Sequence, residues 1–358
     1  MSRTGANNLE FRTIDAGNVD ALAGGLSVLH EAIRGERRDA RYWRWCYVEG
    51  PLGGGGSVAA LHGGGVVGRL GRVPVRFVVA GRRVEAALYE GLHVLPSSRS
   101  WQCYRGLLAE SLRTSAARRS VFGYAFVTRS VAALSVRTGG VRLGRVPFVV
   151  GVLDVARALE GWSVPRPLAL AGGLFHPWLG LRPRRRGPAD LVIRPVDHFD
   201  AAFDDLWQAI EPRRAVAAVR NAAYLNWRYA TCPGRRYVCL AAYRELQRPE
   251  GLVVVRRRAE RRDAFVLELF ARDDDRAVLR ALLQRAMLAL GRAGAGLVAA
   301  SFPAGSAEAA VVRDLGFRPW AGRLLGIELI VTPDAEGRSG PERRLSNWSF
   351  SLGDWLTY

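Results

Sequence analysis

Residues 40–53 read ARYWRWCYVEGPLG, and residues 222–235 read AAYLNWRYATCPGR. When the two stretches are aligned, tyrosines, a tryptophan and a proline coincide at one constant offset, which Trp45 and Trp227 set at 182 residues (227 − 45). A repeat period close to half of a 358-residue chain predicts two copies of one domain. Because both copies keep the aromatic residues, we expect them to anchor a helix on a sheet rather than to line a site.

The composition is that of an ordinary globular protein, with 49% hydrophobic and 24% charged residues. The four cysteines show no paired CxxC spacing, which argues against a disulfide framework and a structural zinc site. The N-terminal stretch MSRTGANNLEFRTID is unlike a signal peptide, and no apolar run reaches the roughly eighteen residues of a membrane span. These features predict a protein of the reducing cytoplasm.

The net charge of +19, from 52 Lys and Arg against 33 Asp and Glu, indicates an anionic partner, unless it only reflects an arginine-rich genome. Nucleic acid is disfavoured because the chain has no recognisable nucleic-acid-binding motif. An acidic carrier protein, a nucleotide cofactor and an anionic membrane face remain as candidates.

Both halves show the same order of a strand meander, a helix, a strand, a helix and a strand, which is typical of an α+β domain. In the first half these elements are expected at 66–96, 104–119, 121–128, 130–139 and 141–154. In the second half the matching strands and helices are expected at 264–270, 274–294, 295–302, 305–316 and 323–332.

We therefore predict an N-terminal domain over 1–158, a linker over 159–190 and a C-terminal domain over 191–358. The linker is rich in proline, glycine and arginine, which break any long helix. Its apolar stretch LALAGGLFHPWLGL, followed by RPRRR, leaves open a peripheral contact with a membrane.

The chain resembles the GNAT acyltransferases in their tandem form, with two GNAT-like domains. Besides the repeated aromatic stretch, the resemblance rests on LHVLPSSRSWQCYRGLLAESL (92–112), on AALSVRTGGVRLGRVP (132–147) with its counterpart AAVVRDLGFRPW (309–320), and on the tail NWSFSLGDWLTY (347–358). It implies an α+β fold with two mixed, mostly antiparallel sheets flanked by helices. It also implies transfer of an acyl group from a thioester to a primary amine.

The resemblance places the acyl donor in the first half, on the strand end, loop and helix start near residue 100. The donor-binding residues are then Leu92, Val94, Leu95, Arg99, Ser100, Trp101, Gln102, Cys103, Tyr104 and Arg105. Backbone N–H groups at a helix N-terminus favour a phosphate. In the second half, the matching loop ARDDDRAV (271–278) carries three aspartates that would repel one.

The first-half loop lacks the glycines that the family usually has there. The crowding is consistent with either an acyl carrier protein, which offers phosphopantetheine without a nucleotide, or a relaxed acyl-CoA site. Carrier proteins are acidic, so Arg82, Arg83, Arg99 and Arg105 are the docking residues to test.

Glu90 is the candidate general base and His93 the alternative, because both lie on the strand that leads to the loop. The family's usual acid is a tyrosine at the position of Ser135, so either Tyr124 or Tyr104 replaces it or the thiolate leaves without an acid. The five histidines lack the spacing of metal ligands, so no metal is expected.

The predicted function is thus N-acyl transfer from an acyl-CoA or an acyl carrier protein to a primary amine. The resemblance suggests an acceptor that is a peptide, a secondary metabolite or an amino sugar, and a fatty acyl group is one option. The alternative is a catalytically inactive tandem GNAT that acts as a binding or scaffold protein. A cleft plugged by Trp101 and Tyr104 would favour that alternative.

Overall fold

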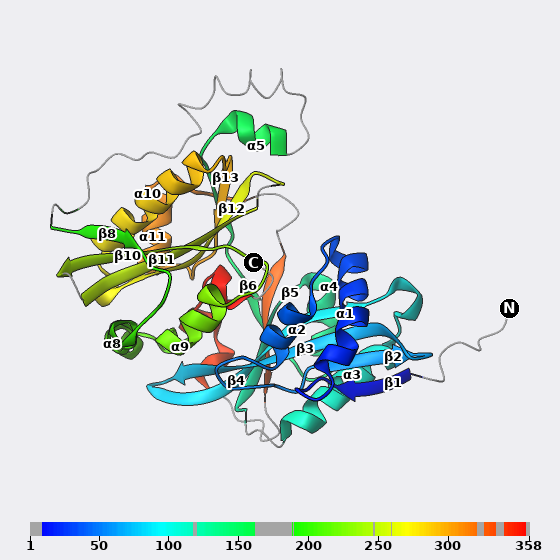
Figure 1. Ribbon diagram of the computed structural model, residues 1–358. Helices are drawn as coiled ribbons and strands as arrows, with labels where there is room; N and C mark the ends of the chain where they lie inside the picture. The colour runs from blue at the N-terminus through cyan, green and yellow to red at the C-terminus, as the bar shows by residue number, and fades with distance from the viewer. Residues whose placement is uncertain are drawn as a thin grey trace.

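The computed structural model describes residues 9–116, 120–161, 188, 190–245, 248–258, 260–320, 326–333 and 340–355. The apolar and basic stretch predicted as a linker and membrane contact falls outside these residues. The two halves form two mixed sheets, blue to cyan and green to yellow in Figure 1, with helices packed on them. The α+β prediction is confirmed.

The first sheet has the strand order β1-β2-β3-β4-β5-β15-β6. Its strands are β1 (Leu9–Thr13), β2 (Val58–His62), β3 (Gly65–Val79), β4 (Arg82–Val94), β5 (Phe122–Thr128), β15 (Ile327–Pro333) and β6 (Val141–Arg145). Two short strands, β9 (Val216–Ala218) and β16 (Trp348–Ser349), extend it beside β3. The helices of this half are α1 (Val19–Arg34), α2 (Ala40–Tyr47), α3 (Trp101–Ala116) and α4 (Arg129–Val136).

The second sheet has the order β14-β7-β13-β12-β11-β10-β8. Its strands are β14 (Arg318–Pro319), β7 (Val149–Val152), β13 (Leu297–Ala300), β12 (Asp263–Ala271), β11 (Arg248–Arg258), β10 (Val238–Glu245) and β8 (Val192–Pro195). The helices are α5 (Val155–Gly161), α8 (Ala201–Ile210), α9 (Ala222–Leu225), α10 (Arg276–Arg292) and α11 (Ala307–Asp314).

Besides β9 and β16, one further strand of each half lies in the sheet of the other half. β15, from the end of the chain, lies between β5 and β6, while β7, from the first half, pairs with β13 and β14. The single strand expected over 141–154 is therefore wrong. The chain leaves the first sheet after Arg145, passes Pro147, which cannot donate a ladder hydrogen bond, and enters the second sheet at Val149. The domain limits at 158 and 191 stay a prediction.

The repeated aromatic stretches meet at the centre of the molecule. The Trp45 and Trp227 rings stack with their centroids 5.0 Å apart, and each indole donates a hydrogen bond to the other's backbone carbonyl, at 2.8 and 3.1 Å. Both are buried in one hydrophobic core that contains residues of both halves. The contact is self-complementary, as in the interface of a twofold dimer, so a local twofold axis relates the halves.

Turn and capping residues set the local geometry of the β3–β4 hairpin and of the start of α3. β3 and β4 form a hairpin whose two-residue turn, Ala80–Gly81, has both residues in the left-handed region at φ 49° and 77°, which suits the twist of the strands. Ser100 begins α3 because its hydroxyl accepts a hydrogen bond from the Cys103 N–H at 3.1 Å.

Replacement of Trp45 by alanine is expected to lower the free energy of unfolding by about 3–5 kcal/mol, because it removes a buried ring and a hydrogen bond. Trp227→Ala should act similarly, and the double variant should cost less than the sum by about 0.5–3 kcal/mol, because the rings are each other's partner. Urea unfolding of the four proteins measures this. Trp101→Ala, at 37% exposure, is the control and should change stability little. If the two substitutions lowered the free energy of unfolding by fully additive amounts, the two rings would not stabilise each other.

Candidate functional site

The first sheet opens between two of its central strands. β4 and β5 run parallel and pair from Ala86 with Phe122 to Leu88 with Tyr124, where the ladder ends. Beyond that point, no strand of the described chain pairs with this edge of β4. A cavity of about 110 Å³ lies in the opening, bordered by residues 88–92 of β4 and 125–127 of β5.

A β-bulge shapes β4 at this opening. The register against β3 shifts between Glu90 and His93, and Gly91 within it has φ +59°, a conformation that favours glycine. A Cβ on Gly91 would lie within 2.5–2.7 Å of the Arg69 guanidinium. The bulge therefore depends on glycine at this position, both for its backbone angle and for the space that Arg69 fills.

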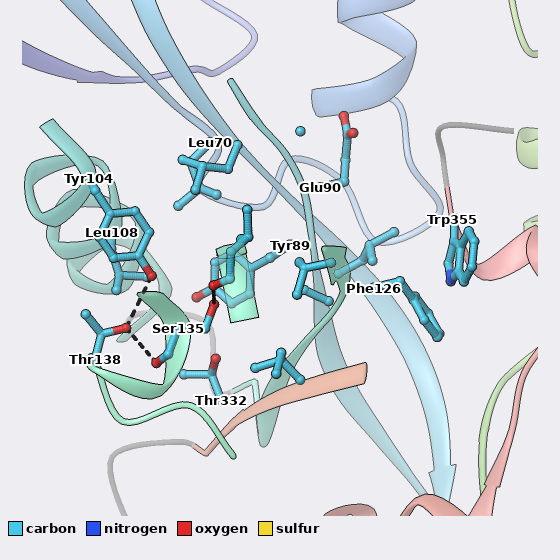
Figure 2. Close-up of a pocket in the computed structure, with 17 residues that line it drawn as sticks. Leu70, Tyr89, Glu90, Tyr104, Leu108, Phe126, Ser135, Thr138, Thr332 and Trp355 are labelled. Carbon is cyan, nitrogen blue, oxygen red and sulfur yellow. Dashed lines mark hydrogen bonds between the residues drawn. The ribbon is translucent and has the colours of Figure 1, made fainter. Parts of the chain in front are cut away.

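The cavity walls come from both halves of the chain, as Figure 2 shows. Tyr104 and Leu108 of α3 and Ser135 of α4 close one side. Ile330 and Thr332 of the exchanged strand β15 and Trp355 of the C-terminal segment close the other. The remaining lining residues are Leu70, Val131 and Thr138. The cavity is thus mostly apolar with a few polar groups, as binding sites for small molecules are.

Glu90 lies beside the cavity with a side chain that is 10% exposed. Its carboxylate accepts a hydrogen bond from the Arg69 guanidinium at 3.2 Å, and the Cys46 thiol lies 3.9 Å away. The structure therefore brings this predicted base to the opening between the strands. Arg69 was not predicted from the sequence. It lies in GRLGRVP (68–74), and an arginine there does not stand out in a chain with so many arginines.

Arg69 is 1% exposed and touches groups from several elements. It donates hydrogen bonds to the Tyr47 hydroxyl and to Glu90, and it lies over the Trp43 ring at 4.9 Å. Its other nitrogen is within 3.4 Å of His30 and 3.3 Å of His93. A buried cation with a carboxylate partner holds that partner in one place.

His93 lies next to Arg69 and is not among the residues that line the cavity. Burial, with the Arg69 charge adding to it, lowers the pKa of His93 to about 2. The same two causes lower the pKa of His30 to about 3. A group with so low a pKa is a weak base at neutral pH, so the geometry favours Glu90 over His93.

Tyr124 does not reach the cavity. It pairs with Leu88 in the last rung before the strands separate, and its ring is buried against Phe77 and Trp348. Burial raises its pKa well above the usual value. Tyr104 is the tyrosine that lines the cavity from α3, with its hydroxyl 3.3 Å from Thr138 Oγ1 (Figure 2).

The other residues predicted to bind the donor lie at different places, and few of them reach the cavity. Leu92 lines the cavity, whereas Cys103 is buried under α3. Leu95 and Val94 lie at the end of β4, where the Val94 carbonyl accepts a hydrogen bond from Arg99 at 3.2 Å. The rest gather, mostly exposed, where α3 begins, namely Arg99, Ser100, Trp101, Gln102 and Arg105.

The second half has a matching opening that its own chain fills. β12 and β13 pair only from Asp263 to Phe265, and Ser349, Phe350 and Ser351 line the remaining space of about 50 Å³. There Glu268 accepts hydrogen bonds from Tyr229 at 2.6 Å and Ser351 at 3.0 Å. This opening is smaller than the one in the first half, and more charged residues border it.

A network of buried ion pairs lies at the same opening. Arg220 pairs with Glu268 at 3.2 Å and with Asp354 at 2.8 Å. At the start of α10, the Asp275 carboxylate accepts the N–H groups of Ala277 and Val278. This carboxylate thus already satisfies two of the free N–H groups at that helix N-terminus.

The fold is that of tandem GNAT proteins. Over 93% of this chain and 100% of the other, it superposes on a tandem GNAT protein from the clavulanic acid biosynthesis pathway, with a TM-score of 0.59 and 17% identity. Saccharomyces cerevisiae N-myristoyltransferase, solved with myristoyl-CoA, matches over 91% of this chain and 80% of its own, with a TM-score of 0.67 and 12% identity. A probable N-acyltransferase from Enterococcus faecalis matches over 92% and 73%, with a TM-score of 0.60 and 13% identity.

No family model matches the sequence, and no curated protein matches it either. The likeness in three dimensions thus identifies a tandem GNAT fold, as the resemblance in the sequence predicted. Among the described residues, no helix is long and apolar enough to cross a membrane. Within the same part of the chain, no group of His, Cys, Asp and Glu is arranged to hold a metal ion.

The two buried histidines predict how stability depends on pH. Each stays neutral when folded but takes up a proton near pH 6.5 when unfolded, so the unfolded chain binds more protons below that pH. The free energy of unfolding should fall as the pH drops below 6.5, by up to about 1.4 kcal/mol per pH unit for each histidine. Urea unfolding between pH 5 and 7.5 measures this slope. The double variant His30→Gln/His93→Gln should have a shallower one, and an unchanged slope would assign the effect to other groups.

Proposed function

We propose that the protein is an N-acyltransferase whose single donor site is the opening between β4 and β5. The observation that carries this proposal is the cavity of about 110 Å³ at the end of the paired region, with Glu90 beside it. A thioester donor can lie along the unpaired edge of β4, whose backbone groups have no strand next to them there. An amine can then approach the thioester carbonyl from the side of Glu90.

Glu90 acts as the general base in this proposal. It removes a proton from the acceptor ammonium, so that the amine nitrogen can attack the thioester carbonyl carbon. Arg69 and the bulge at Gly91 hold the carboxylate in place. The new C–N bond forms, the nitrogen loses its second proton to solvent, and the C–S bond breaks with its electron pair leaving on sulfur.

Tyr104 is the residue we propose to protonate the departing thiolate. Its hydroxyl faces the cavity and has Thr138 Oγ1 within hydrogen-bond distance. Tyr104 replaces the tyrosine that the family usually has on the next helix, where this chain has Ser135. A hydroxyl in this wall is well placed because the donor sulfur has to lie between the separated strands.

The transferred acyl group is short. The cavity of about 110 Å³ is smaller than the roughly 150 Å³ cavity that admits a benzene molecule. The buried side chains of Leu70, Leu88 and Ile330 bound it. Space of this size favours an acetyl group or an acyl chain a few carbons longer over a fatty acyl group. The acceptor in this proposal is a primary amine on a peptide, a secondary metabolite or an amino sugar.

A binding-only role receives less support. Trp101 lies outside the cavity, and Tyr104 forms part of its wall rather than a plug. The second half, in contrast, places its own side chains in the matching opening. We therefore assign catalysis to the first half and a structural role to the second opening.

Glu90→Gln is expected to lower kcat/KM for N-acyl transfer by about 10²–10⁴, because the variant keeps the shape of the side chain and loses the base. Transfer from an acyl-CoA panel to a mixture of primary amines, followed by mass spectrometry, measures it. Glu85→Gln is the matched control on the same strand, where Glu85 contacts Ser120 outside the cavity. Equal activity of wild type and Glu90→Gln would refute the assigned role of Glu90.

The limit on acyl length has its own test. Wild type should prefer acetyl to butanoyl donors over octanoyl and longer ones, while Ile330→Ala should extend the accepted length by a few carbons. The substitution removes part of a wall residue that is 1% exposed, at an expected cost of about 2–5 kcal/mol in stability. Competition between donors of different length, followed by mass spectrometry, gives the ratio. A wild-type preference for long chains would contradict the size argument.

A further inference from the structure

Three exposed arginines and an exposed tryptophan lie near the start of α3 and the end of α4. Arg99 precedes α3, Trp101 and Arg105 lie one turn apart within it, and Arg137 follows α4. We call these four residues the basic rim. The Trp101 ring lies 5.5 Å from that of Tyr104, and Arg137 directly precedes Thr138. Because Tyr104 and Thr138 both line the cavity, Trp101 and Arg137 lie next to the proposed donor site.

The arginines of the rim have no acidic partner in the described part of the chain. Arg137 lies over the Trp101 ring at 4.8 Å, and Arg99 donates a hydrogen bond to the Val94 carbonyl. All three side chains are exposed. Residues 91–150 as a whole contain nine arginines and one acidic residue, Glu110, which pairs with Arg113.

The second half provides an internal comparison. Where α10 begins, three arginines also gather, but each is neutralised by an aspartate. Arg213 pairs with Asp273 at 2.7 Å, Arg214 with Asp274 at 2.5 Å, and Arg244 with Asp275 at 3.0 Å. At the start of α10 these three arginines thus have acidic partners, whereas the three arginines of the basic rim have none among the described residues.

We propose that the basic rim docks an acidic carrier protein, which presents the acyl group on its phosphopantetheine arm. This inference rests on the proposed transfer from a thioester and names the macromolecule that delivers it. Tryptophan and arginine are the residues that contribute most to protein–protein interfaces. Unpaired positive charge also steers an acidic partner toward the site.

The side chains at the start of α3 agree with such a partner. Trp101 is 37% exposed, with Gln102 beside it, at a position where a nucleotide pyrophosphate would need close approach to the backbone. A carrier protein brings a single phosphate and no nucleotide, and it can cover the tryptophan. The two arginines predicted at the far end of β4 do not belong to the rim, since Arg83 already pairs with Glu211 at 2.8 Å.

The experiment offers the same short acyl group on three carriers: the acidic acyl carrier protein of fatty-acid synthesis, CoA and free pantetheine. We expect kcat/KM to be at least about tenfold higher for the carrier protein at low salt, and the advantage to shrink in 0.5 M salt as the charges are screened. Arg105→Glu and Arg137→Glu should each lower it about tenfold for the carrier protein only. Arg213→Glu, at the matching place in the second half, is the control and should change nothing.

Binding separates this inference from the proposed function. Titration with the same carrier protein, read by fluorescence anisotropy, should show salt-dependent binding that Arg105→Glu weakens, even when no amine is present. If the carrier protein does not bind, or if the wild type and both rim variants use the acylated carrier protein no better than acyl-CoA, the docking inference is wrong, while transfer from acyl-CoA still supports the enzyme. If carrier protein binds but no thioester is consumed with any amine, the proposed function fails instead. If anionic lipid vesicles bind to the protein and the carrier protein does not, the inference is also overturned.

Discussion

The stacked pair of Trp45 and Trp227 is the contact on which the rest of the architecture depends. Each indole donates to the other's carbonyl, so the two halves can meet only in an arrangement that is close to twofold symmetric. That symmetry extends to the sheets, since β7 and β15 take equivalent places in the partner sheet. Neither half holds its full set of strands alone. The two repeats therefore form one folding unit with a shared core.

The exchange of strands has a direct consequence for the site. The cavity lies in the first sheet, yet Ile330, Thr332 and Trp355 in its wall come from the end of the chain. The C-terminal segment also supplies Ser351 and Asp354, which fill the second opening. One segment therefore completes one site and closes the other.

The sequence predicted features that local patterns encode. The offset between the two aromatic stretches predicted two copies, and the strand that leads to the loop predicted Glu90 at the opening. The strand exchange could not be predicted, because alternation shows that a segment is a strand but does not identify its neighbour. The position of Tyr124 could not be predicted for the same reason, since only the register shows that it precedes the separation of β4 and β5 and does not line the cavity. Arg69 had no signal, because its partners lie 21–39 residues away.

The difference between the two openings comes from few residues on a common framework. At the start of α3, Ser100 caps the helix with a neutral hydroxyl, and the nearby arginines stay exposed. At the start of α10, Asp275 caps the helix with a charge, and its neighbours neutralise the arginines around it. A carboxylate at a helix N-terminus stabilises the helix and excludes another anion from the same place. The two copies of the framework thus differ in charge at corresponding helix starts, because ion pairs neutralise the arginines beside Asp275, whereas the arginines near Ser100 have no acidic partner among the described residues.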